Sequence, residues 1–293
     1  VQPFDAVWTL DPRLANRYLF VDAAGRPTAS LSRAVTTNLK VRALEIGPSG
    51  HPLDPKVFRA DIAFSAPGLA IATPDGVEAD MGDLQGRINS AAGGAIAFDV
   101  STPGVRLTSV GGKAAGTAGD VKALTIKGTL EDIADATGVV TPERAAVTAR
   151  IDGGLPTPLI DALAGQGGAL VDLLGARVET AINTTRLSQQ AGSLSANLMA
   201  ENANAFAEGE VRGGAFAASK QVVVRMHRIT PEASKRFISS ALPILDKVEK
   251  TADDKPAVIT ADGFTAPLDG DMRKLNGDLV FDLGTVQFQS SDF

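Results

Sequence analysis

The chain has 293 residues, with 28 basic and 34 acidic side chains and a formal net charge of −6 at pH 7. This balance argues against a nucleic-acid partner, because phosphate binding needs a net basic face and usually stacking aromatic rings. There is no cysteine, which excludes disulfides, thiolate metal sites and cysteine nucleophiles. The lack of thiols also suits a protein of the bacterial envelope.

Hydrophobic residues make up 44% of the chain, but only 12 Phe, one Tyr and one Trp supply aromatic bulk. Small aliphatic residues therefore dominate any core, which favours spread-out sheets over a thick globular centre. The length predicts two structural units, which we place at 1–152 and 153–293. No apolar stretch approaches the roughly 20 residues of a membrane-spanning helix. Because the chain begins at Val1 and not at Met, we interpret it as a fragment or a processed form, with any membrane anchor outside it.

The first unit begins with a helix signal and continues as strands. Asp11 and Pro12 form an N-cap followed by a proline at the first helical position, and the helix is predicted to run through Leu14, Tyr18 and Leu19. From Pro27 to about Asp152, apolar and polar residues alternate between turn signals, which predicts an antiparallel sheet. The alternating apolar sets are Phe58, Ala60, Ile62 and Phe64; Val77, Ala79 and Met81; Ile96, Phe98 and Val100; and Leu124, Ile126 and Leu130.

The second unit repeats this order with more distinct signals. Residues 157–174 show an apolar stripe with helical spacing, and Gly175 marks its end. Glycines at 165, 167 and 168 weaken the middle, so the segment can also form two short helices. The strands that follow are predicted at 177–187, 193–201, 205–212, 215–218 and 221–229.

A third helix is predicted to start at Thr230 and Pro231 and to be kinked at Pro243. Its apolar stripe consists of Ala233, Phe237, Ala241, Ile244 and Val248. Strands at 257–261 and 278–288 complete the chain.

The polar motifs predict no catalytic, metal or cofactor site. His51 and His227 lack the paired spacing of metal ligands. The acidic pair Asp269 and Asp271 resembles a calcium loop, but Arg273 stands where such a loop needs an oxygen ligand, so an Asp- and Gly-rich turn is favoured. No phosphate-binding loop or nucleophile elbow is present. We therefore predict that the chain is not an enzyme.

The apolar faces of the strands have two interpretations. They can pack wholly against other sheets and helices, as in a structural protein, or form an open sheet whose concave face holds acyl chains. In the second case, small residues on successive strands leave room for a ligand. The residues predicted to line such a groove are Leu194, Ala196, Leu198, Ala205, Ala207 and Val211, with Phe237 and Leu242 from the third helix.

Three segments carry a resemblance to a known family. They are residues 155–168 (LPTPLIDALAGQGG), 229–237 (ITPEASKRF) and 266–271 (APLDGD). Together they resemble the AsmA-like and TamB-like bacterial envelope proteins, particularly versions from planctomycete-type bacteria, mainly over residues 150–293. The resemblance implies elongated, taco-shaped β-sheets around an apolar groove, phospholipid movement between membranes, and no catalytic residues. The chain lacks the family's N-terminal membrane helix and is short for a full bridge.

We therefore expect a β-rich α+β protein with curved antiparallel sheets, about three amphipathic helices and a periplasmic or envelope location. The first functional hypothesis is a non-enzymatic segment that binds or transfers lipid or another apolar ligand. The alternative is a structural protein of the envelope with self-packed sheets. A hydrolase of envelope polymers is a third, and it needs two carboxylates that converge in a cleft.

Overall fold

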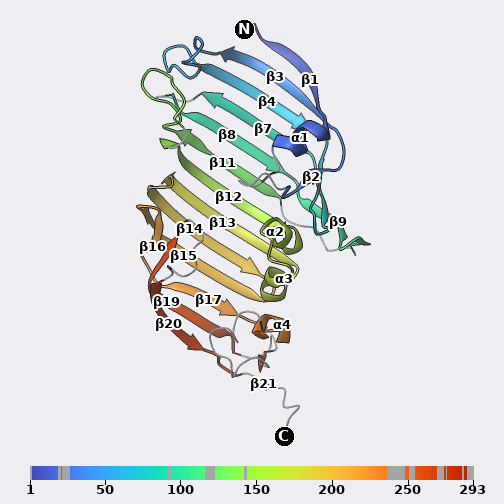
Figure 1. Ribbon diagram of the computed structural model, residues 1–293, viewed down its shortest axis with the longest axis vertical. Helices are drawn as coiled ribbons and strands as arrows, with labels where there is room; N and C mark the ends of the chain where they lie inside the picture. Colours follow the sequence, from blue (N-terminus) through green and yellow to red (C-terminus); the bar gives the residue numbers. More distant parts are fainter. Residues whose placement is uncertain are drawn as a thin grey trace.

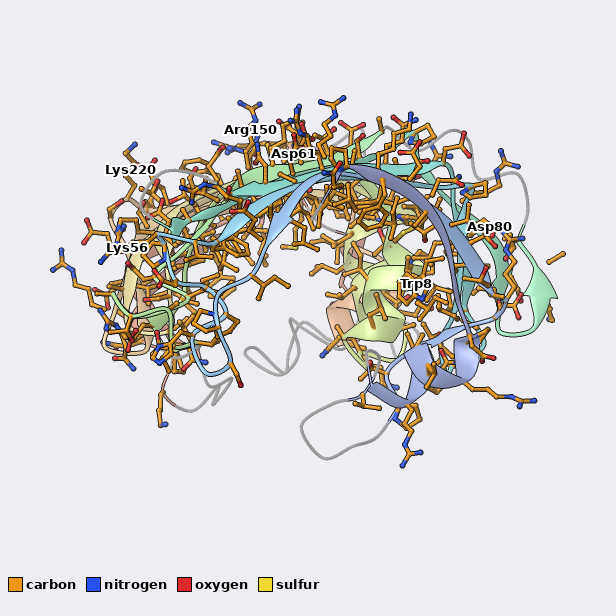
Figure 2. All side chains as sticks on the ribbon, turned by 90° about the horizontal axis from the view of Figure 1, so that it is seen from above. Trp8, Lys56, Asp61, Asp80, Arg150 and Lys220 are labelled. Carbon is orange, nitrogen blue, oxygen red and sulfur yellow. The ribbon has the colours of Figure 1, made fainter. Side chains whose placement is uncertain are left out.

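The protein is a single long, curved β-sheet with helices along one side (Figure 1). The computed structural model describes residues 2–18, 21, 27–90, 94–115, 123–141, 144–235, 248–250, 255–268, 274, 276–285 and 287–288. Seen along its long axis, the sheet forms an arch with a convex outer face and a concave inner face (Figure 2). The β-rich α+β class and the curved antiparallel sheets predicted from the sequence are confirmed.

Fourteen strands form the large sheet, and every pairing in it is antiparallel. In spatial order the first ten are β1 (Phe4–Leu10), β3 (Val35–Glu45), β4 (Arg59–Ala66), β7 (Leu84–Ser90), β8 (Ile96–Thr102), β11 (Leu124–Glu131), β12 (Ala146–Pro156), β13 (Arg177–Leu187), β14 (Ala191–Ala200) and β15 (Ala203–Arg212). Next come β16 (Ala215–Ala218) and β17 (Val222–Met226), which each pair with β15 on one side and with β19 (Ala257–Pro267) on the other. The last strand is β20 (Asn276–Asp282), which pairs with β19. The order follows the chain closely, so most neighbours are joined by a local connection.

The two ends of the strands carry different connections, which gives the sheet two flanks. At one flank, here called the helical flank, the connections contain all the described helices: α1 (Pro12–Tyr18), α2 (Thr157–Leu163), α3 (Ala169–Leu174) and α4 (Pro231–Ala233). A second, five-stranded sheet grows from connections at the same flank: β2 (Ser30–Leu31), β5 (Leu69–Ala72), β6 (Glu78–Met81), β9 (Val105–Val110) and β10 (Lys113–Ala114). The short pair β18 (Val248–Glu249) and β21 (Gln287–Phe288) completes the described elements.

The opposite flank, here called the loop flank, carries loops and turns without described helices. The larger loops connect β3 to β4 and β11 to β12. Register shifts between Val41 and Ala43 and between Val147 and Ala149 place β-bulges close to this flank. Because a bulge bends its strand and increases its twist, these irregularities contribute to the curvature of the arch.

The three clusters of the buried core lie at the helical flank, while further residues such as Val41, Ile133 and Ala146 are buried near the loop flank. One cluster lies beneath α1 and the small sheet, one around Leu159 of α2, and one beneath α3. Leu159 packs with Val105 of β9 and Val77, so α2 closes the space between the two sheets. The clusters are therefore spread along one side of the large sheet instead of filling its concavity.

Asp161 explains why α2 and α3 are separate helices. Its buried carboxylate accepts hydrogen bonds from the backbone N–H of Gly168 at 2.5 Å and of Leu170 at 2.6 Å, where α3 begins. Gly168 precedes α3 with φ of 90°, and Gly175 ends it with φ of 87°, a region that favours glycine. The alternative of two short helices within 157–174 and the end at Gly175 are confirmed.

Other predictions need correction. There are four described helices and not three, and Val248 of the predicted third helical stripe belongs to β18, where it pairs with Phe288. Residues 236–247, including Pro243, lie outside the described residues. The predicted boundary at 152/153 falls inside β12, which pairs with β11 on one side and β13 on the other, and the division into two units stays a prediction. None of the described helices is long and apolar enough to span a membrane.

Candidate functional site, the apolar inner face

One row of residues runs across ten neighbouring strands of the inner face. Directly paired residues in an antiparallel sheet point to the same side, so the register defines this row. The central row consists of Ala6, Leu39, Phe64, Gly86, Val100, Ile126, Ile151, Ile182, Ala196 and Ala207. At about 4.8 Å between strands, it extends roughly 43 Å.

A second row lies two residues further toward the loop flank and is also apolar. It consists of Phe4, Val41, Ile62, Ile88, Phe98, Gly128, Ala149, Thr184, Leu194, Gly209 and Ala218. Thr184 is its one polar side chain. The two rows together form a continuous apolar floor from β1 to β15.

Aromatic rings fill the floor where glycine leaves no side chain. A Cβ atom added to Gly86 would lie 2.2 Å from Cζ of Phe64, so the Phe64 ring lies over this glycine on the neighbouring strand. Glycine thus allows the ring to lie close to the sheet, which keeps the floor smooth.

The outer face of the same strands is charged. The row next to the central row on this side reads Asp5, Lys40, Ala63, Arg87, Asp99, Lys127, Arg150, Asn183, Ser195 and Glu208. Asp99 and Lys127 form a cross-strand ion pair at 2.9 Å, as do Asp61 and Arg87. Figure 2 shows Asp61, Arg150 and Lys220 on the convex side and Trp8 on the concave side. Within the ten strands of the central row, no described inner-face position holds a charged residue.

The central row of the floor is apolar but not covered, whereas Val41 of the second row is buried. All ten residues of the central row are half-buried, including Ile126, Ile151 and Ile182. At the β1 end, Phe4 is 42% exposed and Trp8 is 53% exposed. At the helical flank, by contrast, Leu159 is 2% exposed and Val105 is 1% exposed. No second layer therefore excludes solvent from the central floor, although its composition is that of a core.

Six of the predicted groove residues lie on the inner face of β14 and β15, three of them (Leu194, Ala196 and Ala207) in the two rows of the floor. Leu194, Ala196 and Leu198 of β14 pair directly with Gly209, Ala207 and Ala205 of β15, and Val211 pairs with Gly192 on the same face. Val211 is fully buried, whereas the other five are half-buried. Phe237 and Leu242 lie outside the described residues.

Most residues of the floor were not predicted from the sequence. The larger side chains of the central row, among them Phe64, Val100, Ile126, Ile151 and Ile182, come mainly from the first unit and from β12 and β13. Their alternation was visible in the sequence, but only the register places them in line with β14 and β15. The edge strand β1 was not predicted at all, although Phe4, Ala6, Trp8 and Leu10 alternate.

The polar features resemble no catalytic centre. His51 lies in the loop between β3 and β4, with Nδ1 2.9 Å from the Thr137 carbonyl oxygen, and His227 contacts Asn204 at 3.0 Å. In the part of the chain that is described, no group of acidic or histidine residues could hold a metal ion. Asp269 and Asp271 fall outside that part. The outer face has a polar hollow of about 620 Å³ lined by Lys40, Arg87, Asp99, Lys127 and neighbouring polar residues.

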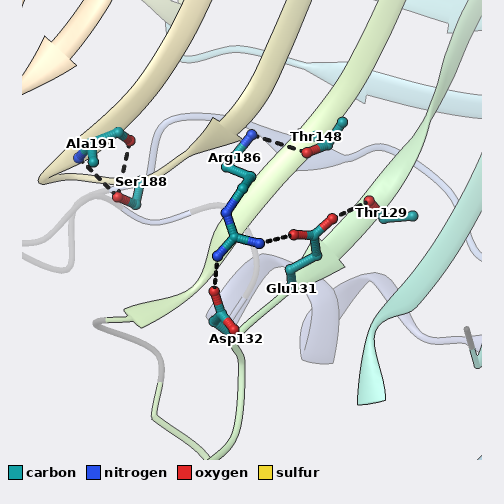
Figure 3. A network of polar contacts seen from close by, with 7 residues as sticks. All are labelled: Thr129, Glu131, Asp132, Thr148, Arg186, Ser188 and Ala191. Atoms are coloured by element: carbon teal, nitrogen blue, oxygen red, sulfur yellow. Dashed lines mark hydrogen bonds and ion pairs between the residues drawn. The ribbon is translucent and has the colours of Figure 1, made fainter. Parts of the chain in front are cut away.

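A polar network fixes the loop flank next to the floor (Figure 3). The Arg186 guanidinium donates to Glu131 and to Asp132 at 2.5 Å each, and its backbone N–H donates to Thr148 Oγ1 at 2.9 Å. Arg186 and Asp132 both have positive φ, at 45° and 54°. The network thus ties the end of β13 to the loop that follows β11.

The loop between β11 and β12 is also ordered by Asp135. Its carboxylate accepts hydrogen bonds from the hydroxyl and backbone N–H of Thr137 and from the backbone N–H of Val139. The Thr137 hydroxyl is the main cause that lowers the pKa of Asp135 below its ordinary value of 3.8, and the backbone donors lower it further.

Comparisons of the chain with protein-family models, curated proteins and solved structures found no match. The function is therefore inferred from the geometry of the inner face.

Proposed function

We propose that the protein is a non-enzymatic segment that binds or transfers lipid in the bacterial envelope, of the AsmA-like and TamB-like kind. The inner face holds acyl chains or a similar apolar ligand, and the charged outer face contacts water. The observation that carries the proposal is the central row, in which ten neighbouring residues are apolar and half-buried.

The dimensions of the floor support an acyl ligand. Acyl chains that span half of a bilayer's hydrocarbon core are about 15 Å long. The floor, at roughly 43 Å by strand spacing, can therefore accept several chains side by side or in succession. Because the floor has no charged side chain and Thr184 is its one polar side chain, it selects for apolarity and length more than for a particular chemical structure.

The alternative of a structural protein with self-packed sheets expects the inner face to be buried. The half-buried central row favours the binding function over this alternative. The helical flank is self-packed, but its three clusters cover only one side of the sheet.

A matched pair of variants on β13 tests the proposal. Ile182→Glu places a carboxylate on the floor, whereas Asn183→Glu places it on the outer face, one residue along and opposite Arg150. Each purified protein is extracted with organic solvent, and lipid is quantified by mass spectrometry. We expect wild type and Asn183→Glu to carry lipid, and Ile182→Glu to carry about tenfold less, because a charge in an apolar site is costly.

Thermal unfolding of both variants provides the control, since neither change should abolish the fold at a solvent-accessible position. Wild-type protein without lipid, after expression in cells with intact membranes, would contradict the proposal. Equal lipid content in the two variants would place the ligand elsewhere.

A further inference from the structure

Four exposed aliphatic side chains gather on the loop flank. Ile46 and Val57 belong to the loop between β3 and β4, and Val139 and Val140 belong to the loop between β11 and β12; their exposed fractions range from 38% to 60%. We call these four residues the rim patch. Water-exposed aliphatic residues at adjacent loop tips are costly unless they contact an apolar partner.

The two loops that carry the rim patch are held together by direct contacts. The backbone N–H of Leu53 donates to the Gly138 carbonyl oxygen at 3.3 Å, and His51 Nδ1 lies 2.9 Å from the Thr137 carbonyl oxygen. A Cβ atom added to Gly138 would lie 2.3 Å from the Asp54 nitrogen, which shows how closely the loops approach. Each rim-patch residue lies close in sequence to one of these contact points.

Four acidic residues of the described part of the two loops and their flanks are engaged. The Asp54 carboxylate accepts the Lys56 backbone N–H, and Asp135 accepts three hydrogen bonds. Glu131 and Asp132 pair with Arg186.

The remaining charges beside the rim patch favour an anionic surface. Glu45 lies directly opposite Arg59 in the register of β3 and β4. The exposed Lys56 ammonium, next to Val57, has no acidic partner among the described residues. A cation beside exposed aliphatic residues is suited to anionic lipid headgroups over an acyl layer.

The apolar floor extends toward one of the two loops of the rim patch. Along β11, Ile126 and Leu130 lie on the inner face, and the buried Ile133 follows at the start of the loop that carries Val139 and Val140. On β12, Val147 pairs with Leu130 and continues the same apolar surface. Apolar side chains therefore continue from the floor to the base of the loop that carries Val139 and Val140.

From these observations we infer that the loop flank docks on the surface of an anionic lipid bilayer, with the rim patch inserted among the headgroups and Lys56 paired with phosphate. This inference rests on the proposed function and names the source from which the floor is loaded. We choose a bilayer over a protein groove as the partner, because its acyl layer contacts the aliphatic residues and its phosphates contact the Lys56 ammonium.

Flotation with vesicles tests the docking. The vesicles contain one part phosphatidylglycerol to two parts phosphatidylcholine. The two rim variants are Ile46→Ser with Val57→Ser, and Val139→Ser with Val140→Ser. The matched control is Val110→Ser with Val280→Ser, which removes exposed valines far from the loop flank. We expect each rim variant to lose about tenfold or more in vesicle binding, and the control to bind like wild type.

A second measurement separates docking from loading. A fluorescent fatty acid, supplied as monomer in solution, reports on the floor without a membrane. We expect rim variants to bind it as wild type does. If wild type binds vesicles through the rim patch but not the fatty acid, docking stands and the proposed function fails. If the rim variants float like wild type, or if the control loses as much binding as they do, docking is overturned.

Discussion

The helical flank and the centre of the inner face are built from the same residue types but differ in what lies over them. At the flank, α2 and the small sheet close over Leu159 and Val105, which are almost fully buried. In the centre, Ile126 and Ile151 belong to the same strands that reach this flank, yet they stay half-buried. An apolar strand face of this protein is therefore a core only where a connecting segment, such as α2 or the small sheet, packs on it as a second layer.

The largest loss of stability is expected where a side chain beneath that second layer is shortened. Leu159→Ala should lower the free energy of unfolding by about 2–5 kcal/mol, because its buried side chain leaves a cavity between α2 and the small sheet. Urea unfolding measures the change. A loss below about 1 kcal/mol would mean that α2 does not seal the two sheets as described.

The second-largest loss of stability is expected at the junction between α2 and α3. Asp161→Ala leaves the N–H groups of Gly168 and Leu170 without their acceptor, which should cost about 1–3 kcal/mol. Asp161→Asn keeps one carbonyl oxygen and should cost less. The order of the three proteins in urea unfolding is the check, and equal stability of Ala and Asn variants would contradict the capping role.

A floor residue should matter less for stability. Ile151→Ala removes a half-buried side chain over which no layer closes, so no enclosed cavity forms and the loss should stay below about 1.5 kcal/mol. The same urea experiment compares it directly with Leu159→Ala. Similar losses in the two variants would remove the distinction between covered and uncovered regions.

The smallest effect concerns pH at the loop flank. The pKa of Asp135 is lowered from 3.8 by its hydrogen bonds with Thr137 and Val139, so its stabilising contribution is complete above that value and is lost as pH falls through the folded-state pKa. Carboxyl NMR should therefore give a titration midpoint below 3.8. The stability difference from Asp135→Asn should shrink at acid pH, and a midpoint at or above the ordinary value would contradict this.

Local patterns in the sequence determined most of the strands, the helix start at Asp11 and Pro12 and the glycine stop at Gly175, because backbone preferences and alternation act over a few residues. The shared face of Leu194, Ala196 and Leu198 on β14 followed from the same alternation. The helical stripe through Val248 did not hold, since this residue pairs with Phe288 from a distant segment.

Only the tertiary structure decided which apolar faces are covered. The alignment of Phe64, Ile126 and Ile182 in one row depends on strand register, which bulges at the loop flank shift by one residue. The continuity of the sheet through β12 depends on partners on both sides. Alternation thus determined that the inner face is apolar, whereas the placement of the connections at one flank left its centre open, because a face is buried only by what packs on it.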